Sequence, residues 1–313
     1  MPPLPEGLLI ELVTPLRPNG ALDTASLSRL VHHVAPWSAA LVAGTPGVGE
    51  ALALPPALRL ESFAALLDLM PAPLPLFFGI SGASPEETCH LVQQLQQEAT
   101  HRHASRPLYW LDLPLWWHSN RGLPQAYKQL GQYLQHPLVL INQPFLIRGK
   151  GQPLKHVNIR TSVLKKLTQL PLVAGMIYHG DMRRFLHYFA AAAGRPEFML
   201  YEADEHRFLT RPGARGLVSG GAQLFPRIWQ EVTQACLYPE RAHGREAIAS
   251  RIWERSQELL SLQELYQFQP AALLKQGLHQ LGLLSHPVAW PTTPAAPAHL
   301  TEKFGQILAQ VRE

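Results

Sequence analysis

Cysteine is scarce in this chain: Cys89 and Cys236 are its two cysteines among 313 residues. They lie far apart and not in a zinc-type spacing, so we expect no disulfide framework and favour a reducing, cytoplasmic location. No apolar run approaches the roughly 18 residues of a membrane-spanning helix. Residues 1–5 also lack the basic start of a secretory signal. We therefore expect no association with a membrane.

Charge is also sparse, because charged residues make up 16% of the chain. The net charge of +4 comes from scattered basic residues, which argues against a nucleic-acid partner. Hydrophobic residues reach 46% and recur periodically, which excludes a disordered chain. A phosphate-binding loop, a dinucleotide-type glycine motif, zinc spacing and a Gly-x-Ser-x-Gly elbow are all missing from the sequence. We expect neither a cofactor nor a metal.

Short apolar runs alternate with amphipathic stretches along the first three quarters of the chain. Eight runs are predicted as buried strands: 8–16, 39–43, 74–80, 108–113, 138–142, 172–178, 198–201 and 216–219. Helices are predicted between them: from Asp23 to about Val34, then 55–70, 84–103, 123–134, 159–168, 181–193 and 226–236. Ser84, Pro85 and Glu87 form a capping box at the start of the third helix.

Eight strands that alternate with helices every 25 residues or so favour a parallel sheet. Eight such units match the size of a closed barrel, and we predict an α/β fold, a (β/α)8 TIM barrel, over residues 1–238. A doubly wound sheet is the alternative, since periodicity does not show closure. Three further helical stretches without strands, at about 241–262, 270–283 and 297–311, predict a C-terminal helical extension over 239–313, packed on the barrel.

The active site of such a barrel lies at the C-terminal ends of the strands, so the residues that follow each run are candidates. A glycine-rich turn at Gly44 and Thr45 could hold a small anion through backbone N–H groups, or could be an ordinary turn. Tyr178 and His179 could form an acid–base pair or be structural. The other polar candidates are Asn142, Arg148, Ser219 and the cluster Glu202, Asp204, Glu205 and His206. That cluster could bind a metal or transfer protons, or it could be a solvated junction with Asp204 as a helix cap.

Six segments, taken in order, resemble the dihydrodipicolinate synthase and N-acetylneuraminate lyase family. They are LVTPLRPNGALDTASLSRLV, VAGTPGVGEALAL, LFFGISGASPEET, LVLINQP, LVAGMIYHGDM and LYEADEHRFLTRPGARGLVS. The second is similar to the family's Gly-Thr-Thr-Gly-Glu loop, and the fourth to its Tyr-Asn-x-Pro strand. The segments are collinear and cover nearly the whole chain. The resemblance implies the TIM-barrel fold and a homodimer or homotetramer.

The resemblance also implies a lysine at the end of the sixth strand, whose amine forms a Schiff base with a 2-oxo acid. Here that stretch holds Met176 and Ile177, and no lysine occurs between Lys166 and Lys275. Further family positions have changed: Ile141 stands where the fifth strand has tyrosine, and Trp116 and Trp117 replace a phenol after the fourth strand. Thr45 remains from the proton-relay set, and Arg148 corresponds to a carboxylate-binding arginine.

Three functions stay open. The first is a catalytically silent family member that binds a small ligand, such as a carboxylate or oxo acid, or a protein partner. The second is an enzyme with chemistry other than a Schiff base, using Thr45, Tyr178, His179, Glu202 and Arg148. The third is an ordinary Schiff-base lyase with a displaced lysine, such as Lys150 or Lys155 in the inserted loop 145–156.

Overall fold

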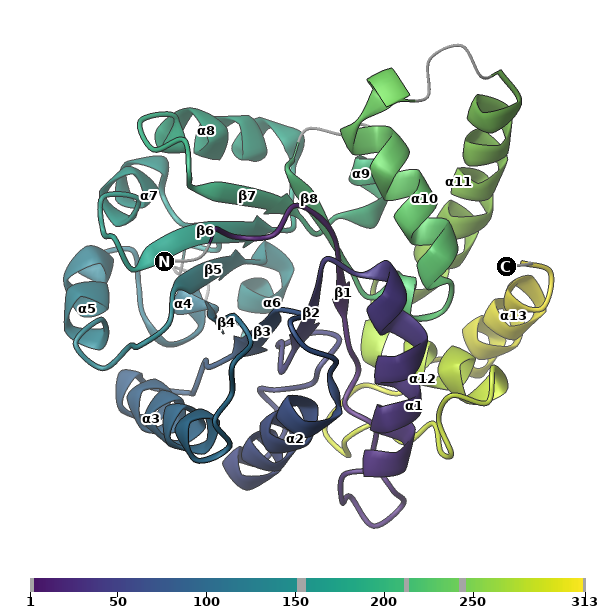
Figure 1. The fold of residues 1–313 in the computed structure, drawn as a ribbon, viewed down its shortest axis with the longest axis horizontal. Helices are drawn as coiled ribbons and strands as arrows, with labels where there is room; N and C mark the ends of the chain where they lie inside the picture. Colours follow the sequence, from purple (N-terminus) through teal and green to yellow (C-terminus); the bar gives the residue numbers. More distant parts are fainter. Residues whose placement is uncertain (1–2, 151–155, 211–213, 242–245, 312–313) are drawn as a thin grey trace.

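Eight parallel strands close into a barrel in sequence order, which confirms the predicted (β/α)8 fold (Figure 1). The computed structural model describes residues 3–150, 156–210, 214–241 and 246–311. Its strands are β1 (Gly7–Glu11), β2 (Ala40–Ala43), β3 (Leu76–Gly79), β4 (Leu108–Asp112), β5 (Leu138–Asn142), β6 (Val173–Tyr178), β7 (Met199–Glu202) and β8 (Gly216–Ser219). Pairing of β1 with β8 closes the barrel, so the alternative of an open doubly wound sheet is wrong.

Helices surround the barrel on its outside (Figure 1). They are α1 (Thr24–Val34), α2 (Pro56–Leu69), α3 (Pro85–His101), α5 (Leu123–Leu130), α7 (Thr161–Leu167), α8 (Met182–Ala192) and α10 (Pro226–Leu237). Local chemistry sets their starts, as at α3, where the Ser84 hydroxyl accepts a hydrogen bond from the backbone N–H of Glu87. The Glu87 carboxylate in turn accepts from the N–H of Ala83 rather than that of Ser84, a shifted version of the predicted capping box.

Three short helices follow strands directly, and none of them was predicted. They are α4 (Pro114–Trp117), α6 (Pro144–Gly149) and α9 (Glu205–Thr210). The predicted loop 145–156 is therefore helical in its first part, and residues 151–155 lie outside the described part. The first strand is shorter than predicted: β1 ends at Glu11, residues 12–15 are irregular, and the turn closed by the bridge between Leu16 and Leu22 comes after them.

Aromatic side chains fill the half of the barrel that contains the N-terminal ends of the strands. The rings of Phe77 and Tyr109 stack with centroids 4.6 Å apart, and Tyr201 meets Phe77 edge to face. The two phenols donate hydrogen bonds to the carbonyl oxygens of Pro3 and Pro5, which precede β1. The N-terminal end of the barrel is thus packed, and space for a ligand lies toward the other end.

A helical C-terminal extension lies at one side of the barrel (Figure 1). It consists of α11 (Glu246–Tyr266), α12 (Pro270–Gln280) and α13 (Ala298–Leu308). Lys275 of α12 is fully buried and forms an ion pair with Glu50, which lies in the loop after β2. The extension therefore touches the C-terminal end of the barrel. The division of the chain into two parts at residue 238 stays a prediction.

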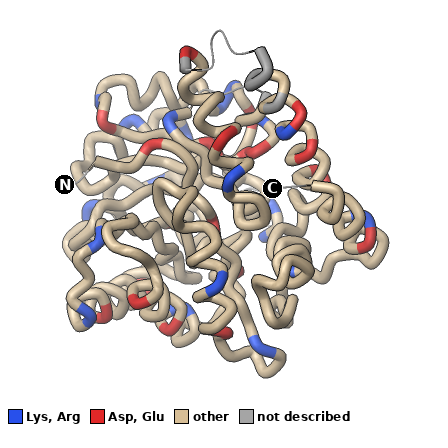
Figure 2. The backbone as a smooth tube through the Cα atoms, turned by 45° about the vertical axis from the view of Figure 1, so that its right-hand side comes forward, with Lys and Arg blue, Asp and Glu red and all other residues tan. Residues whose placement is uncertain are grey.

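Within the described ranges, no helix has the length and apolar character needed to cross a membrane. Basic and acidic positions are interspersed along the backbone in the view of Figure 2. This distribution agrees with the scattered charge noted in the sequence.

Candidate functional site

A small cavity of about 60 Å³ lies at the C-terminal ends of the strands. Its apolar wall comes from four strands, through Val42, Ile141, Ile177 and Val218. Its polar wall includes Glu11, Thr45, Gln143, His179, Glu205, Gln263, Tyr266 and Gln267. The last three of these residues belong to α11 or directly follow it, so the extension closes one side of the cavity.

Two isoleucines stand side by side where β5 and β6 end. Ile141 and Ile177 are register partners, and both line the cavity. Successive side chains of a strand point to opposite faces, so Met176 and Tyr178 face the surrounding helices. Of the two candidates for the lysine position, Ile177 is therefore the one that faces the cavity. An aliphatic side chain there supplies no amine.

Glu11 is an acidic cavity residue that sequence analysis missed. It ends β1, lies in register with Val42, and is half-buried among the cavity-lining residues. Burial raises the pKa of its carboxyl to about 7, the hydrogen bond with Thr45 lowers it, and the charge of Glu205 raises it further. The group therefore titrates near neutral pH, as a general acid–base group must.

The second carboxyl of the cavity, that of Glu205, is held by three donors. Its Oε1 accepts hydrogen bonds from the Ser219 hydroxyl at 2.6 Å and the Gly221 N–H at 2.9 Å, and its Oε2 accepts one from the Tyr266 hydroxyl. Burial raises the pKa of Glu205, while the hydroxyls of Ser219 and Tyr266 lower it. Ser219, predicted as a ligand-binding residue, thus orients Glu205 and is not among the cavity-lining residues.

The turn after β2 has a packing reason for its glycine. Gly44 has a φ of +62°, and a Cβ there would lie 3.0 Å from the Phe78 ring. Thr45 lines the cavity, and its hydroxyl accepts a hydrogen bond from the Gly49 N–H at 3.1 Å. Thr45 is thus placed at the cavity as expected, whereas Gly44 shapes the turn.

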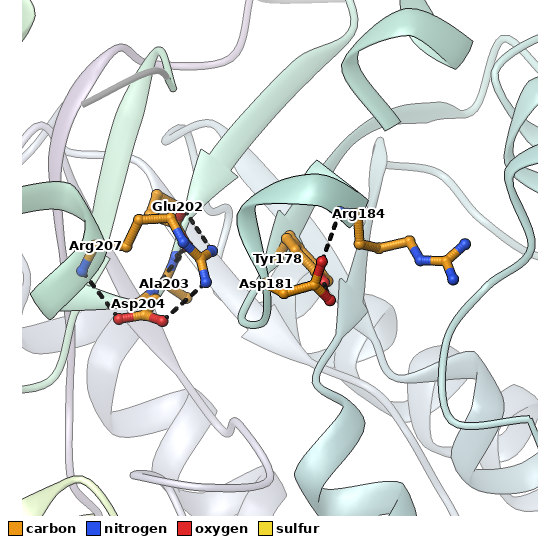
Figure 3. Close-up of polar contacts among 7 residues, drawn as sticks. All are labelled: Tyr178, Asp181, Arg184, Glu202, Ala203, Asp204 and Arg207. Atoms are coloured by element: carbon orange, nitrogen blue, oxygen red, sulfur yellow. Dashed lines mark hydrogen bonds and ion pairs between the residues drawn. The ribbon is translucent and has the colours of Figure 1, made fainter. Parts of the chain in front are cut away.

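The predicted pair of Tyr178 and His179 is split by the strand. His179 lines the cavity, and burial lowers the pKa of its imidazole. Tyr178 packs instead against α8, with its ring 5.2 Å from that of Tyr188, and its hydroxyl is 3.4 Å from an Asp181 oxygen (Figure 3). Burial raises the pKa of Tyr178. The two side chains do not share a site.

Glu202 and Asp204 form an ion-pair cluster with Arg207 rather than part of the cavity wall. Arg207 binds Glu202 at 3.0 Å and Asp204 at 3.1 Å (Figure 3). Asp204 also accepts a hydrogen bond from the Arg207 N–H, which caps α9 as the sequence analysis allowed. Burial raises the pKa of Glu202 to about 7, and the charge of Arg207 lowers it.

The remaining predicted positions also lie outside the cavity wall. Asn142 is buried, donating a hydrogen bond to Asn158 and accepting one from the Ile159 N–H, so it anchors the chain before α7. Arg148 is exposed on α6. Trp117 donates to the buried carboxylate of Asp112. Their predicted roles in ligand binding or as replaced catalytic positions stay predictions.

Two described lysines, Lys150 and Lys275, bind other groups and do not line the cavity. Lys150 donates a hydrogen bond to the carbonyl oxygen of Trp116 at 2.8 Å and lies 4.0 Å from the centroid of that indole ring. Lys275 is paired with Glu50. Lys155 falls outside the described residues. In the part of the chain that is described, no group of three histidine, cysteine or acidic side chains could hold a metal ion.

Glu11 and Tyr266 are the cavity residues that the sequence signals least. A strand-end carboxylate inside an apolar run was the available signal for Glu11. Tyr266 lies 61 residues after its partner Glu205, in a helix without strand-end context, and no motif marks it.

A sequence profile of the dihydrodipicolinate synthetase family matches residues 4–310. A 4-hydroxy-tetrahydrodipicolinate synthase of Thioalkalivibrio sulfidiphilus is 26% identical over 314 residues, covering 98% of this chain and 95% of that protein. One from Methylococcus capsulatus is 25% identical and covers 92% of each chain. The structure of dihydrodipicolinate synthase from Bacteroides thetaiotaomicron superposes with a TM-score of 0.82 at 21% identity, covering 99% of this chain and all of that one.

Proposed function

The chain belongs to the dihydrodipicolinate synthetase family, and from this premise we propose that it binds a small ligand at the barrel mouth without forming a Schiff base. One observation carries the proposal: the cavity face at the end of β6 is occupied by Ile177, with Ile141 beside it on β5. Two aliphatic side chains supply neither a nucleophile nor a proton-relay phenol at these positions. The names of the relatives therefore do not transfer directly, because function lies in the site rather than in the fold.

A second function, catalysis by proton transfer, is supported by one feature of the same cavity. Glu11 has a pKa of about 7 and stands next to the Thr45 hydroxyl, so it could take up or release a proton at neutral pH. The sequence-based candidates for this function change accordingly: Thr45 and His179 line the cavity with Glu11, whereas Tyr178, Glu202 and Arg148 do not.

The third function, a Schiff-base lyase with a displaced lysine, has less support. Burial lowers the pKa of Lys150, which favours a nucleophilic amine. Its amine is nevertheless bound to the Trp116 carbonyl and does not line the cavity. An adduct would need Lys150 to leave these contacts.

We further propose that the chain forms the homodimer or homotetramer implied by the family resemblance. Two large apolar side chains of α8, Leu186 and Phe189, are 57% and 59% exposed, as side chains at a protein interface commonly are before assembly. Light scattering on the purified protein would measure the mass directly, and a monomer would contradict this part. The cytoplasmic location stays a prediction.

Borohydride trapping tests the main proposal. The protein is incubated with pyruvate or a longer 2-oxo acid, reduced, and examined by intact mass and peptide mapping beside an active family enzyme. We expect an adduct on the active enzyme and none on this chain. An adduct mapped to Lys150, and lost in Lys150→Arg, would instead establish the displaced-lysine function.

Replacing Ile177 by lysine provides the positive counterpart. The cavity holds two carboxyls that can accommodate a new ammonium group, so we expect Ile177→Lys to fold. We also expect it to be trapped by pyruvate where the natural chain is not. If Ile177→Lys folds but gives no adduct, the assignment of Ile177 to the lysine position is wrong.

A further inference from the structure

The charged side chains on the cavity wall are all acidic in the described part of the chain. Glu11 comes from β1 and Glu205 from α9, and no lysine or arginine lies among the cavity-lining residues there. His179, which also lines the cavity, does not restore positive charge, because burial lowers the pKa of its imidazole and so favours the neutral form.

The cations close to the cavity are already matched to other groups. Arg207 binds the carboxylates of Glu202 and Asp204, and Lys275 binds that of Glu50. A carboxylate ligand would therefore place its negative charge against two carboxyl groups, with no lysine or arginine among the described residues of the cavity wall. Burial strengthens that repulsion, since charges interact more strongly away from water.

Glu11 and Glu205 differ in how fully they are satisfied. Glu205 accepts from Ser219, Gly221 and Tyr266, so its orientation is fixed by the protein. Glu11 and Thr45 both line the cavity, and the Glu11 carboxyl has no set of donors like that of Glu205 among the described residues. A cationic donor placed in the cavity would bind the Glu11 carboxylate. Glu205, whose oxygens already accept three hydrogen bonds, would attract the cation by its charge alone.

The remaining wall suits a short aliphatic chain. Ile141 and Ile177 form one continuous apolar patch across β5 and β6, and Val42 and Val218 add to it from β2 and β8. The amide of Gln143 lies on the same wall and can satisfy a hydroxyl group. The cavity volume of about 60 Å³ favours a small ligand.

We propose that this cavity selects a small aliphatic amine, bound as its ammonium ion by Glu11, over a carboxylate or a 2-oxo acid. The proposal rests on the proposed function, ligand binding without a Schiff base. It reverses the ligand class that the family resemblance implies, because the residues that changed removed an amine from the wall and left two acids on it.

Titration of Glu11 gives binding a characteristic pH dependence. Its carboxyl, with a pKa of about 7, is faced by Glu205 from α9, Tyr266 from α11, His179 after β6 and the Thr45 hydroxyl after β2. An ammonium ligand favours the ionised form, so binding at neutral pH should release a proton and should strengthen as pH rises through about 7. A carboxylate ligand should do the opposite.

Calorimetry with defined probes tests the proposal on the full-length protein. Ethanolamine and propylamine are compared with propanoate and pyruvate at equal ionic strength, in two buffers of different ionisation enthalpy so that proton release is measured. We expect the amines to bind at least about 10-fold more tightly, a difference of about 1.4 kcal/mol. Tighter binding of the carboxylates, or no binding of any amine, would overturn the proposal.

Glu11→Gln is the variant that assigns the effect, and Glu61→Gln, on the exposed face of α2, is its matched control. We expect the former to lose about 10-fold or more in amine affinity together with the proton release, and the latter to lose neither. Unchanged amine affinity in Glu11→Gln would overturn the assignment of Glu11 as the binding group. If that variant does not fold, the natural chain gives the test, because amine binding without proton release would also overturn the assignment. Pyruvate trapping on the same samples reports separately on the proposed function, because an adduct contradicts that function whatever the amines do.

Discussion

Glu11 ends β1 and Glu50 lies in the loop after the neighbouring strand β2, yet the surroundings of the two carboxyls differ in kind. Glu50 is 2% exposed and binds the Lys275 ammonium, the Trp290 N–H at 2.8 Å and the Thr293 hydroxyl at 2.7 Å. It ties the loop after β2 to the C-terminal extension. Glu11 lines the cavity together with Thr45 and a second acid, Glu205.

The difference separates a structural acid from a functional candidate. A buried carboxylate with a matched cation and further donors is satisfied, and its removal leaves the partner charge uncompensated. A strand-end carboxyl with a raised pKa and no facing cation in the described cavity wall costs stability when it ionises, and such groups cluster at functional sites. The following predictions test this contrast, beginning with the largest effect.

Removing the Lys275 ammonium from its ion pair with Glu50 should cause the largest loss of stability. Lys275→Met leaves the Glu50 carboxylate buried without its counterion, and we expect a loss of about 3–5 kcal/mol in the free energy of unfolding. Urea-induced unfolding followed by fluorescence measures it. The matched control, Lys166→Met, changes an exposed lysine of α7 and should lie within about 0.5 kcal/mol of the natural chain.

A double variant checks the cause of that loss. Glu50→Gln combined with Lys275→Met removes both charges, so it should recover part of the stability lost in the single variant. Equal losses in the single and double variants would show that packing around Lys275, rather than the unpaired charge, sets the effect.

Glu11→Gln should raise the free energy of unfolding, and only at pH values above about 4.5. The pKa of the Glu11 carboxyl is about 7 in the folded protein, against an ordinary value of 4.5, so the folded protein binds more protons than the unfolded chain between these pH values. Stability from this group therefore falls as pH rises from about 4.5 to about 7. We expect the stability gain of Glu11→Gln over the natural chain to grow by about 1–3 kcal/mol from about pH 5 to about pH 8, because the partial exposure of Glu11 reduces the full linkage value.

The comparison must be made as a difference between the two proteins at each pH. Glu202 also has a raised pKa and contributes to the pH dependence of both proteins alike. The carboxyl of Glu205 interacts with that of Glu11, so the difference between the proteins reports on Glu11 together with this interaction. A gain that is the same at both pH values would mean that Glu11 is ionised throughout and is not the titrating group of the cavity.

The barrel could be predicted from sequence because its signals are local and repeated. Each strand is a short apolar run, each helix has its own periodicity and cap, and eight repeats of adequate spacing leave few other architectures. The ends of these elements were less certain: the apolar residues after Glu11 continue the hydrophobic run but are not part of the strand, which hid the carboxylate that ends β1.

The side chains that line the cavity could not be predicted from any single segment of the sequence. Whether Met176 or Ile177 faces the cavity depends on the phase of β6 relative to its neighbours, and the register with Ile141 decides it. Tyr266 reaches Glu205 from a helix of the extension. Such long-range contacts follow from packing, whereas sequence patterns report mainly neighbours along the chain.

Tyr178 offers the smallest effect and the sharpest test of that phase argument. Because its side chain faces α8, Tyr178→Phe should leave ligand affinity in the cavity unchanged. It should also cost about 0.5 kcal/mol or less in stability, because the hydroxyl makes only a long contact of 3.4 Å with Asp181. Calorimetric titration and urea unfolding of the variant measure the two quantities. His179→Gln is the matched variant on the cavity side, and there affinity should change. If instead Tyr178→Phe weakened binding as much as His179→Gln, the two side chains would act together after all, and the assignment of alternate faces at the end of β6, on which the role of Ile177 rests, would be wrong.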